Sequence, residues 1–194
     1  MVARAMKSAA LTEFPMGKRV PGTDWVMWGV LGLGGMGVVL EVRKGRHLRA
    51  AMKVLRSAFA RSAEFEARFA EEVEVMARLR HPNIVEVWDC GVLSNGSPFL
   101  LMELLTGRTI RAVARDKDMR FTAEAVWKIV GQVCAGLGYA HSANPPVVHR
   151  DVKPDNVFLH GRGHFGAQVK LLDFGIAQVL GTSQSSDEVA GTPR

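Results

Sequence analysis

The chain has 194 residues, of which 47% are hydrophobic and 23% are charged, and its formal net charge is +6. This composition is typical of a globular protein with enough apolar side chains for a sizeable core. The 25 basic residues are scattered and are not interleaved with aromatic residues, so the charge does not predict binding to nucleic acid.

The cysteines and the apolar runs indicate a cellular compartment. Cys90 and Cys134 are far apart and have no CxxC partner, which fits a reduced cytosolic protein. No apolar run approaches the roughly 18–20 residues that a membrane helix needs. The N-terminus has basic residues but lacks the apolar segment of a signal peptide. We therefore expect a cytoplasmic protein without a membrane segment in this chain.

The first predicted elements surround a glycine-rich turn. Pro15, Gly17, Pro21 and Gly22 predict a flexible lead-in over residues 1–24, and Trp25–Leu31 then begins a strand. The turn that follows consists of Gly32, Leu33, Gly34, Gly35, Met36 and Gly37. Rossmann dinucleotide sites carry the same GxGxxG string, but there a helix follows, whereas Val38–Val42 is strand-like. The glycines therefore lie in a strand-turn-strand hairpin, and a Rossmann oxidoreductase is a distant alternative.

A lysine and a glutamate are predicted to meet beneath this hairpin. Ala50–Leu55 is a strand, and its alternation places Ala51 and Lys53 on one face. For an isolated strand, a lysine that faces solvent is the simpler interpretation. The helix predicted over Ser62–Leu79, however, carries Glu72 on its apolar stripe of Phe65, Phe69, Met76 and Leu79, whereas Glu71 faces solvent. Because an inward carboxylate needs a cation, Lys53 is its expected partner.

Further strands and a long helix follow. His81-Pro82-Asn83 ends the first helix, and Ile84–Val92 and Pro98–Leu104 predict an antiparallel pair joined by a turn at residues 94–97. Thr122 is a helix cap, and the helix that it begins has apolar residues at 3–4 spacing: Val126, Ile129, Val130, Val133, Leu137 and Ala140. His141, His160 and His164 lack the company of metal ligands, so we interpret them as surface or hydrogen-bonded histidines.

The stretch Val147–Gly175 carries the strongest chemical signal. Short apolar runs bracket a polar loop with Asp151, Lys153 and Asn156, and the run Val169–Leu172 leads directly into Asp173. Carboxylate and amide oxygens at strand ends suit the binding of a metal ion and phosphate.

These motifs, in this order, resemble those of the protein kinases: a glycine loop, Lys53, Glu72, HRDVKPDN at residues 149–156 and DFG at residues 173–175. GGMG and DFGIA are most similar to bacterial serine/threonine kinases of the eukaryotic-like type. The resemblance implies an α+β, protein-kinase-like fold. We expect an N-lobe over residues 25–105, with a five-stranded antiparallel sheet and one helix, and a partial helical C-lobe over residues 106–194.

The resemblance also implies roles for single residues. The glycine loop would cover the phosphates of ATP, while Val39, Ala51 and Phe158 would sandwich the adenine. Met102 would lie behind the pocket, and the hinge from Glu103 to Leu105 would bind the base. Lys53 and Glu72 would hold the α- and β-phosphates. Asp151 would be the catalytic base, Lys153 would neutralise the γ-phosphate, and Asn156 and Asp173 would bind Mg²⁺.

The final residues resemble an activation segment. Arg150 would pair with a phosphorylated loop over Gly181–Ala190, whose candidate acceptors are Thr182, Ser183, Ser185 and Ser186. A flexible polar linker is the alternative interpretation of this loop. Thr192 resembles a threonine that contacts the catalytic base, and we expect its role to be structural.

Two functions are consistent with the sequence. The first is a serine/threonine protein kinase that transfers the γ-phosphate of ATP to a protein. The second is a non-catalytic ATP-binding or interaction fragment of a truncated kinase, because kinases continue beyond this point with an APE-like segment and further helices. In that case we expect the apolar stripe of the Thr122–His141 helix to be uncovered, so that the chain aggregates or needs a partner.

Overall fold

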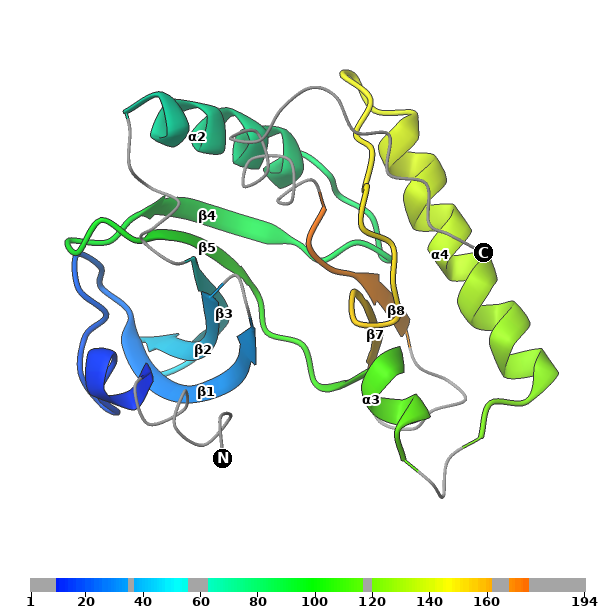
Figure 1. Cartoon of the computed structure of the whole chain (residues 1–194), viewed down its shortest axis with the longest axis horizontal. Helices are drawn as coiled ribbons and strands as arrows, with labels where there is room; N and C mark the ends of the chain where they lie inside the picture. The colour runs from blue at the N-terminus through cyan, green and yellow to red at the C-terminus, as the bar shows by residue number, and fades with distance from the viewer. Residues whose placement is uncertain (1–9, 35–36, 56–62, 117–119, 162–167, 175–194) are drawn as a thin grey trace, which may run out of the picture.

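Two β-sheets form the framework of the molecule (Figure 1). The computed structural model describes residues 10–34, 37–55, 63–116, 120–161 and 168–174, without the side chains of residues 63–68 and 72. The larger sheet has five antiparallel strands in the order β1-β2-β3-β5-β4. Its strands are β1 (Val26–Gly34), β2 (Gly37–Lys44), β3 (Leu48–Leu55), β4 (Val87–Val92) and β5 (Pro98–Glu103). The predicted five-stranded antiparallel sheet is confirmed.

Alternation along β2 gives this sheet two different faces. Val38, Leu40 and Val42 are buried in an apolar cluster on one face. Val39 lies between them in sequence, so it points to the opposite face, where it is paired in register with Lys53 of β3. The strands thus place an apolar core on one side of the sheet and the candidate site on the other.

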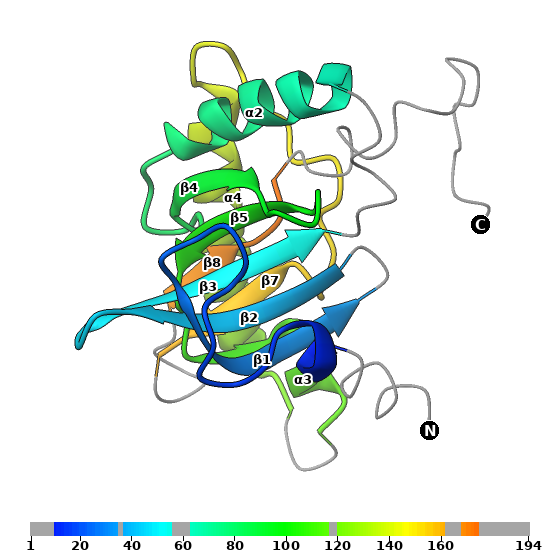
Figure 2. The same ribbon diagram turned by 90° about the vertical axis from the view of Figure 1, so that its left-hand side faces the viewer.

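The segment that precedes β1 packs against the apolar face of the sheet (Figure 2). The side chains of Phe14 and Val20 are 2% and 0% exposed. The segment is also bonded to β1, because the Met27 amide donates to the Lys18 carbonyl and the Gly17 amide donates to the Met27 carbonyl, both at 2.9 Å. Over residues 10–24, the expectation of a flexible lead-in is therefore corrected: its apolar side chains cover part of the core.

Helix α2 (Ala63–Ala77) runs along β4 and closes the other side of the sheet (Figure 1). Phe69, Val73 and Met76 recur at helical spacing, and all three are buried in a second apolar cluster. This cluster also contains Leu171 and Phe174, so it joins the two lobes. The predicted helix is present, although the side chains of Phe65 and Glu72 lie outside the described part.

A second sheet of three antiparallel strands lies beyond the hinge. It contains β6 (Gly107–Thr109), β7 (Val157–His160) and β8 (Gln168–Leu171), in that order. Helix α3 (Ile110–Ala114) follows β6, and the Thr109 hydroxyl accepts a hydrogen bond from the Ala112 amide at its first turn. The strand β6 and the helix α3 were not predicted from the sequence, whereas β7 and β8 coincide with predicted short apolar runs.

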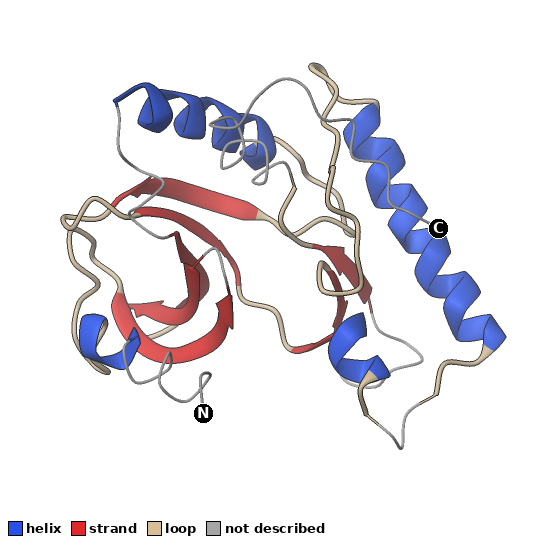
Figure 3. Ribbon diagram, viewed as in Figure 1, coloured by secondary structure: helices blue, strands red, loops and turns tan. Residues whose placement is uncertain are grey.

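Helix α4 (Ala123–His141) packs against β8 and is the longest described helix (Figure 3). Its predicted cap is confirmed, because the Thr122 hydroxyl accepts a hydrogen bond from the Ala125 amide at 3.2 Å. One face of α4 is buried through Gly136 and Ala140, while Val126 and Trp127 on another face are 45% and 75% exposed. No helix within the described ranges is long and apolar enough to cross a membrane.

Candidate functional site

A cavity of about 330 Å³ lies between the larger sheet and the second sheet. Its walls come from β1, β2, β3, the hinge, β6, β7 and the segment after β8. Nine residues that sequence analysis assigned to a nucleotide site line it: Gly32, Val39, Ala51, Lys53, Met102, Glu103, Leu105, Phe158 and Asp173. Its lining is largely apolar with a few charged groups, as in many sites for small molecules and cofactors. The fold thus brings together residues that are up to 141 positions apart, from Gly32 to Asp173.

The glycine hairpin forms one border of this cavity. Leu33 pairs with Val38 and Gly34 pairs with Gly37, but these residues do not line the cavity as Gly32 does. At Gly37 the backbone has φ of 156°, and a Cβ atom there would lie 2.0 Å from the Val54 carbonyl oxygen. Only glycine fits this close approach of β2 to β3. Gly35 and Met36 lie outside the described residues.

A buried ion pair forms the polar end of the cavity. Lys53 Nζ lies 2.7 Å from Asp173 Oδ1, and Lys53 is only 7% exposed. The inward orientation predicted for Lys53 is therefore present. Glu72, its expected partner, has its side chain outside the described part, and the described partner of Lys53 is Asp173. The pair joins β3 to the segment after β8, so it connects the two lobes.

A compact hydrogen-bonded cluster holds the candidate catalytic loop. Lys153 Nζ lies 2.6 Å from Asp151 Oδ2, and Asn156 Nδ2 donates to Asp151 Oδ2 at 3.0 Å and to the Asp151 carbonyl at 2.9 Å. The Asn156 carbonyl accepts a hydrogen bond from the Leu172 amide at 2.9 Å, which ties the loop to the residue before Asp173. The structure thus brings Asp151, Lys153 and Asn156 together beside the polar end of the cavity.

The hydrogen bond from Lys153 holds the pKa of Asp151 below its ordinary value, and the hydrogen bond from Asn156 acts in the same direction. The carboxylate is therefore ionised at neutral pH and can accept a hydrogen bond from a hydroxyl group. It has the charge state that orients a nucleophilic hydroxyl.

His149, two residues before Asp151, is buried beneath the loop. It is 1% exposed, and its ring contacts the Phe174 ring with centroids 4.4 Å apart. Burial lowers its pKa, which favours the neutral imidazole. The Asp151 amide donates to His149 Nδ1 at 3.4 Å, whereas the buried Nε2 atom has no hydrogen-bond partner among the described residues. No role was predicted for this side chain from the sequence, although His149 directly precedes Arg150 and Asp151.

Two residues have unusual backbone conformations: Arg150, which precedes Asp151, and Asp173, which lines the cavity. Arg150 and Asp173 have φ of 62° and 58°, in the left-handed region that residues other than glycine seldom occupy. Arg150 directly precedes the charged residue Asp151, and Asp173 is itself paired with Lys53. Such conformations are frequent where a backbone is held in place for a function.

The donor atoms of Asn156 and Asp173 suit a metal ion such as Mg²⁺. Both described hydrogen bonds of the Asn156 side chain use Nδ2, which leaves its Oδ1 atom for a metal ion. Asp173 supplies carboxylate oxygens. The described residues hold no cluster of three or more acidic, histidine or cysteine side chains, so further ligands would come from phosphate and water. Two oxygen-bearing side chains with phosphates suit Mg²⁺, and the residues fit this ion.

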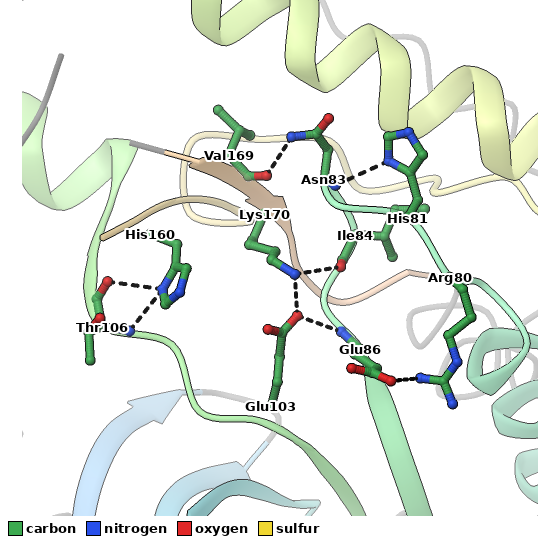
Figure 4. A network of polar contacts seen from close by, with 10 residues as sticks. All are labelled: Arg80, His81, Asn83, Ile84, Glu86, Glu103, Thr106, His160, Val169 and Lys170. Carbon is green, nitrogen blue, oxygen red and sulfur yellow. Dashed lines mark hydrogen bonds and ion pairs between the residues drawn. The ribbon is translucent and has the colours of Figure 1, made fainter. Parts of the chain in front are cut away.

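The hinge has an ion pair of its own, shown in Figure 4. Glu103 Oε1 lies 2.5 Å from Lys170 Nζ and accepts a hydrogen bond from the Glu86 amide at 2.9 Å. Lys170 also donates to the Ile84 carbonyl at 3.4 Å. The Glu103 carboxylate is therefore directed towards β8, and the hinge is anchored to the second sheet.

The cavity has further walls that sequence analysis missed: Leu31, Val85, Gly107, Thr109 and Leu172. Leu31 and Leu172 directly precede the predicted site residues Gly32 and Asp173, so their position in the sequence could have identified them. Gly107 and Thr109 belong to the short strand β6, for which no periodicity was available. Thr182, Ser183, Ser185, Ser186 and Thr192 lie outside the described residues.

Residues 25–194 match the family model described as protein kinase domain. A probable serine/threonine-protein kinase of Streptomyces coelicolor is 39% identical over 160 residues, which are 79% of this chain and 22% of that protein. The serine/threonine-protein kinase PknJ of Mycobacterium tuberculosis is 40% identical over 153 residues, which are 78% of this chain and 25% of that protein. The chain thus spans about a quarter of the length of these relatives.

A solved structure is also similar. The PknI kinase domain of Mycobacterium tuberculosis superposes with a TM-score of 0.69 at 33% identity, and the match covers 88% of this chain and 69% of that domain. A double mutant of the same domain gives a TM-score of 0.70 at 35% identity, with 81% of this chain and 63% of that domain covered. At these identities the similarity extends to sequence as well as fold.

Proposed function

The chain belongs to the protein kinase family, and on that premise we propose that it is a serine/threonine protein kinase that uses ATP. The observation that carries this proposal is the position of Lys53 and Asp173 at the polar end of an apolar cavity, beside the Asp151 cluster. The apolar wall suits an adenine, and the charged end suits phosphates. A lysine at position 153, two residues after Asp151, resembles the catalytic loop of serine/threonine kinases rather than that of tyrosine kinases.

In the proposed reaction, each polar residue has one task. The hydroxyl oxygen of a Ser or Thr forms a bond to the γ-phosphorus of ATP, and the bond from that phosphorus to the β,γ-bridging oxygen breaks. The hydroxyl proton passes to Asp151, which also orients the attacking oxygen. Lys53 contacts the α- and β-phosphates, and Lys153 offsets charge on the transferred group. Mg²⁺, held by Asn156 and Asp173, would neutralise charge on the phosphate oxygens.

The adenine would lie between Val39 and Ala51 on one side and Phe158 on the other. All three line the cavity, with Met102 and the hinge residues Glu103 and Leu105. Cys90 and Cys134 are free thiols, which supports a reducing compartment such as the cytoplasm. The protein partner would be a substrate with an acceptor Ser or Thr.

An exposed apolar surface favours a second candidate function. On α4, Val126, Trp127 and Val130 are 45%, 75% and 43% exposed. A non-catalytic fragment that binds ATP, or that associates with another protein through α4, would carry such a surface. The two functions differ in whether phosphate is transferred.

Phosphate transfer to a generic protein substrate separates the candidates. The purified chain is incubated with Mg²⁺, labelled ATP and the substrate, beside an Asp151→Asn control that keeps the size of the side chain. A kinase predicts incorporation that the control reduces at least about 100-fold, the effect typical of losing an acid-base group. Equal incorporation by both chains would rule out catalysis at Asp151. Nucleotide binding without transfer by either chain would favour the second function.

A further inference from the structure

The outer edge of β8 is bonded to two elements that lie far from it in sequence. One edge of this strand pairs with β7, which leaves the backbone groups of Val169 and Leu171 on the other edge. There the Leu171 amide donates to the Asn83 carbonyl at 2.8 Å, and the Leu171 carbonyl accepts from the Val85 amide at 2.9 Å. The segment after α2 therefore continues the sheet at this edge.

Side chains complete the same edge at Val169. The Val169 amide donates to Gln132 Oε1 at 2.9 Å, and the Val169 carbonyl accepts from Asn83 Nδ2 at 2.9 Å. Asn83 Nδ2 also donates to Gln132 Oε1 at 2.9 Å. Figure 4 shows the bond between Asn83 and Val169. All four outward backbone groups of Val169 and Leu171 thus have partners from outside the second sheet.

Because these hydrogen bonds are buried, they favour a single register of β8. Val169 and Leu171 are fully buried, and Asn83 is 7% exposed. Buried amides and carbonyls need partners, so a shifted β8 would leave several of them unpaired. A shift by one residue would also turn the buried side chains of Val169 and Leu171 to the opposite face. Gln132 and Asn83 therefore define one register for the strand.

The register of β8 determines where Asp173 lies. Asp173 follows Leu171 by two residues, and its carboxylate reaches Lys53 at 2.7 Å. We propose that Gln132 of α4, together with Asn83, is a positioning residue that fixes β8 and thereby holds Asp173 in place for the metal ion and the phosphates. This inference rests on the proposed function in its assignment of Asp173, but the bonds at Val169 are independent of that function.

Two substitutions of Gln132 separate this role from simple stability. Gln132→Glu keeps an oxygen that accepts both hydrogen bonds, whereas Gln132→Met keeps the length of the side chain and removes the acceptor. Val133→Ala is the matched control, because Val133 is the next residue of α4 and packs on the apolar cluster without bonding to β8. The control loses stability through packing alone.

The first measurement is amide hydrogen exchange at Val169 in the full chain. In Gln132→Met we expect exchange at least about tenfold faster than in the wild type, because the amide has lost its acceptor and the strand edge opens locally. Gln132→Glu and Val133→Ala should keep the protection of the wild type. Unchanged exchange in Gln132→Met would overturn the inference, whatever the protein does with nucleotides.

The second measurement is the affinity for ATP by calorimetry, with and without Mg²⁺. Gln132→Met should weaken Mg·ATP binding about tenfold, as expected for a residue that supports a metal ligand, and should leave metal-free ATP unaffected. Gln132→Glu should restore the affinity. An equal loss in Val133→Ala would show general destabilisation and overturn the positioning role. A wild-type chain that binds no Mg·ATP would contradict the proposed function, and exchange at Val169 would then decide the inference alone.

Discussion

The ion pair between Lys53 and Asp173 is the most consequential single contact of the site. Both charges are largely removed from water, Lys53 at 7% exposure and the Asp173 side chain at 30%. Among the described residues, each charge therefore compensates for the burial of the other. Because Lys53 belongs to β3 and Asp173 follows β8, the contact also contributes to the stability of the lobe arrangement.

Replacing Lys53 by Met should lower the free energy of unfolding by about 1–3 kcal/mol, since Asp173 would lose its partner while keeping some contact with water. Urea unfolding measures this change. In the double variant with Asp173→Asn, we expect a loss smaller than the sum of the two single losses, because neither charge of this pair is then left without the other. Strict additivity would show that the two side chains do not interact in solution.

His149 should make the stability of the protein depend on pH. Burial lowers its pKa in the folded state, so below its ordinary value of about 6.5 the unfolded chain binds more protons than the folded chain. Stability should therefore fall as the pH drops below about 6.5. Melting temperatures between about pH 7 and pH 5 test this dependence.

His149→Asn is the matched variant for this titration, because its amide oxygen can accept the Asp151 amide but does not titrate. Its melting temperature should be lower at neutral pH, since the contact with Phe174 is reduced. It should depend less on pH than the wild type over the same range. An identical dependence in both proteins would assign the acid sensitivity to other groups.

At the scale of elements, the contact of α4 with β8 depends on a glycine. A Cβ atom at Gly136 would lie 2.9 Å from Leu171 Cδ1 and 3.2 Å from the Asn83 carbonyl oxygen. Gly131 on the same helix has no atom within 4 Å of such a Cβ. The close approach at Gly136 lets Gln132, one turn earlier, reach the edge of β8.

Alanine at these two glycines should have opposite effects on stability. Gly136→Ala should lower the free energy of unfolding by about 1–3 kcal/mol, because it forces α4 away from β8. Gly131→Ala should raise it by up to about 1 kcal/mol, because alanine favours the helix and meets no obstacle. Denaturant titration of both variants gives the comparison. If Gly136→Ala were the more stable of the two, the packing described here would be wrong.

Elements with strong local signals were predictable from the sequence, and short ones were not. The strands β1 to β5 carry alternating or apolar runs, and α4 has a cap at Thr122 and a long apolar stripe. By contrast, β6 has three residues and α3 has five, too few for any periodicity. Residues 10–24 were expected to be flexible because of their prolines and glycines, yet Phe14 and Val20 fill the core. Only tertiary contacts distinguish such a segment from a linker.

At the scale of the whole molecule, the candidate site combines segments from both lobes. The order of the motifs predicted most of the residues around the cavity, because each motif has a recognisable local pattern. The contacts made by Asn83, Gln132 and Lys170 were not predicted, since hydrogen bonds between distant segments leave no pattern in a single sequence. The contact of Asp173 with Lys53 likewise joins segments that are distant in sequence, so it could not be predicted from a local pattern.

The exposed apolar face of α4 should govern the solubility of the chain. Val126 and Trp127 are 45% and 75% exposed, so replacing both by Gln should change the free energy of unfolding by less than about 1 kcal/mol. The same change should reduce association, which light scattering measures at increasing concentration. Ala140→Gln is the control for the effect on stability. Ala140 lies on the same helix but is fully buried, so its replacement should be strongly destabilising. Unchanged association in the double variant would show that this face of α4 does not cause the chain to self-associate.

The central proposal is that the cavity between the two sheets holds ATP. Calorimetric titration with Mg·ATP tests it in the wild type and in Ala51→Leu, whose larger side chain would occupy the space assigned to the adenine. Leu48→Ala is the control, since Leu48 lies on the same strand and is 47% exposed. We predict saturable binding at one site in the wild type and the control, and no measurable binding in Ala51→Leu. Binding that is absent from the wild type, or equally strong in Ala51→Leu, would contradict the account.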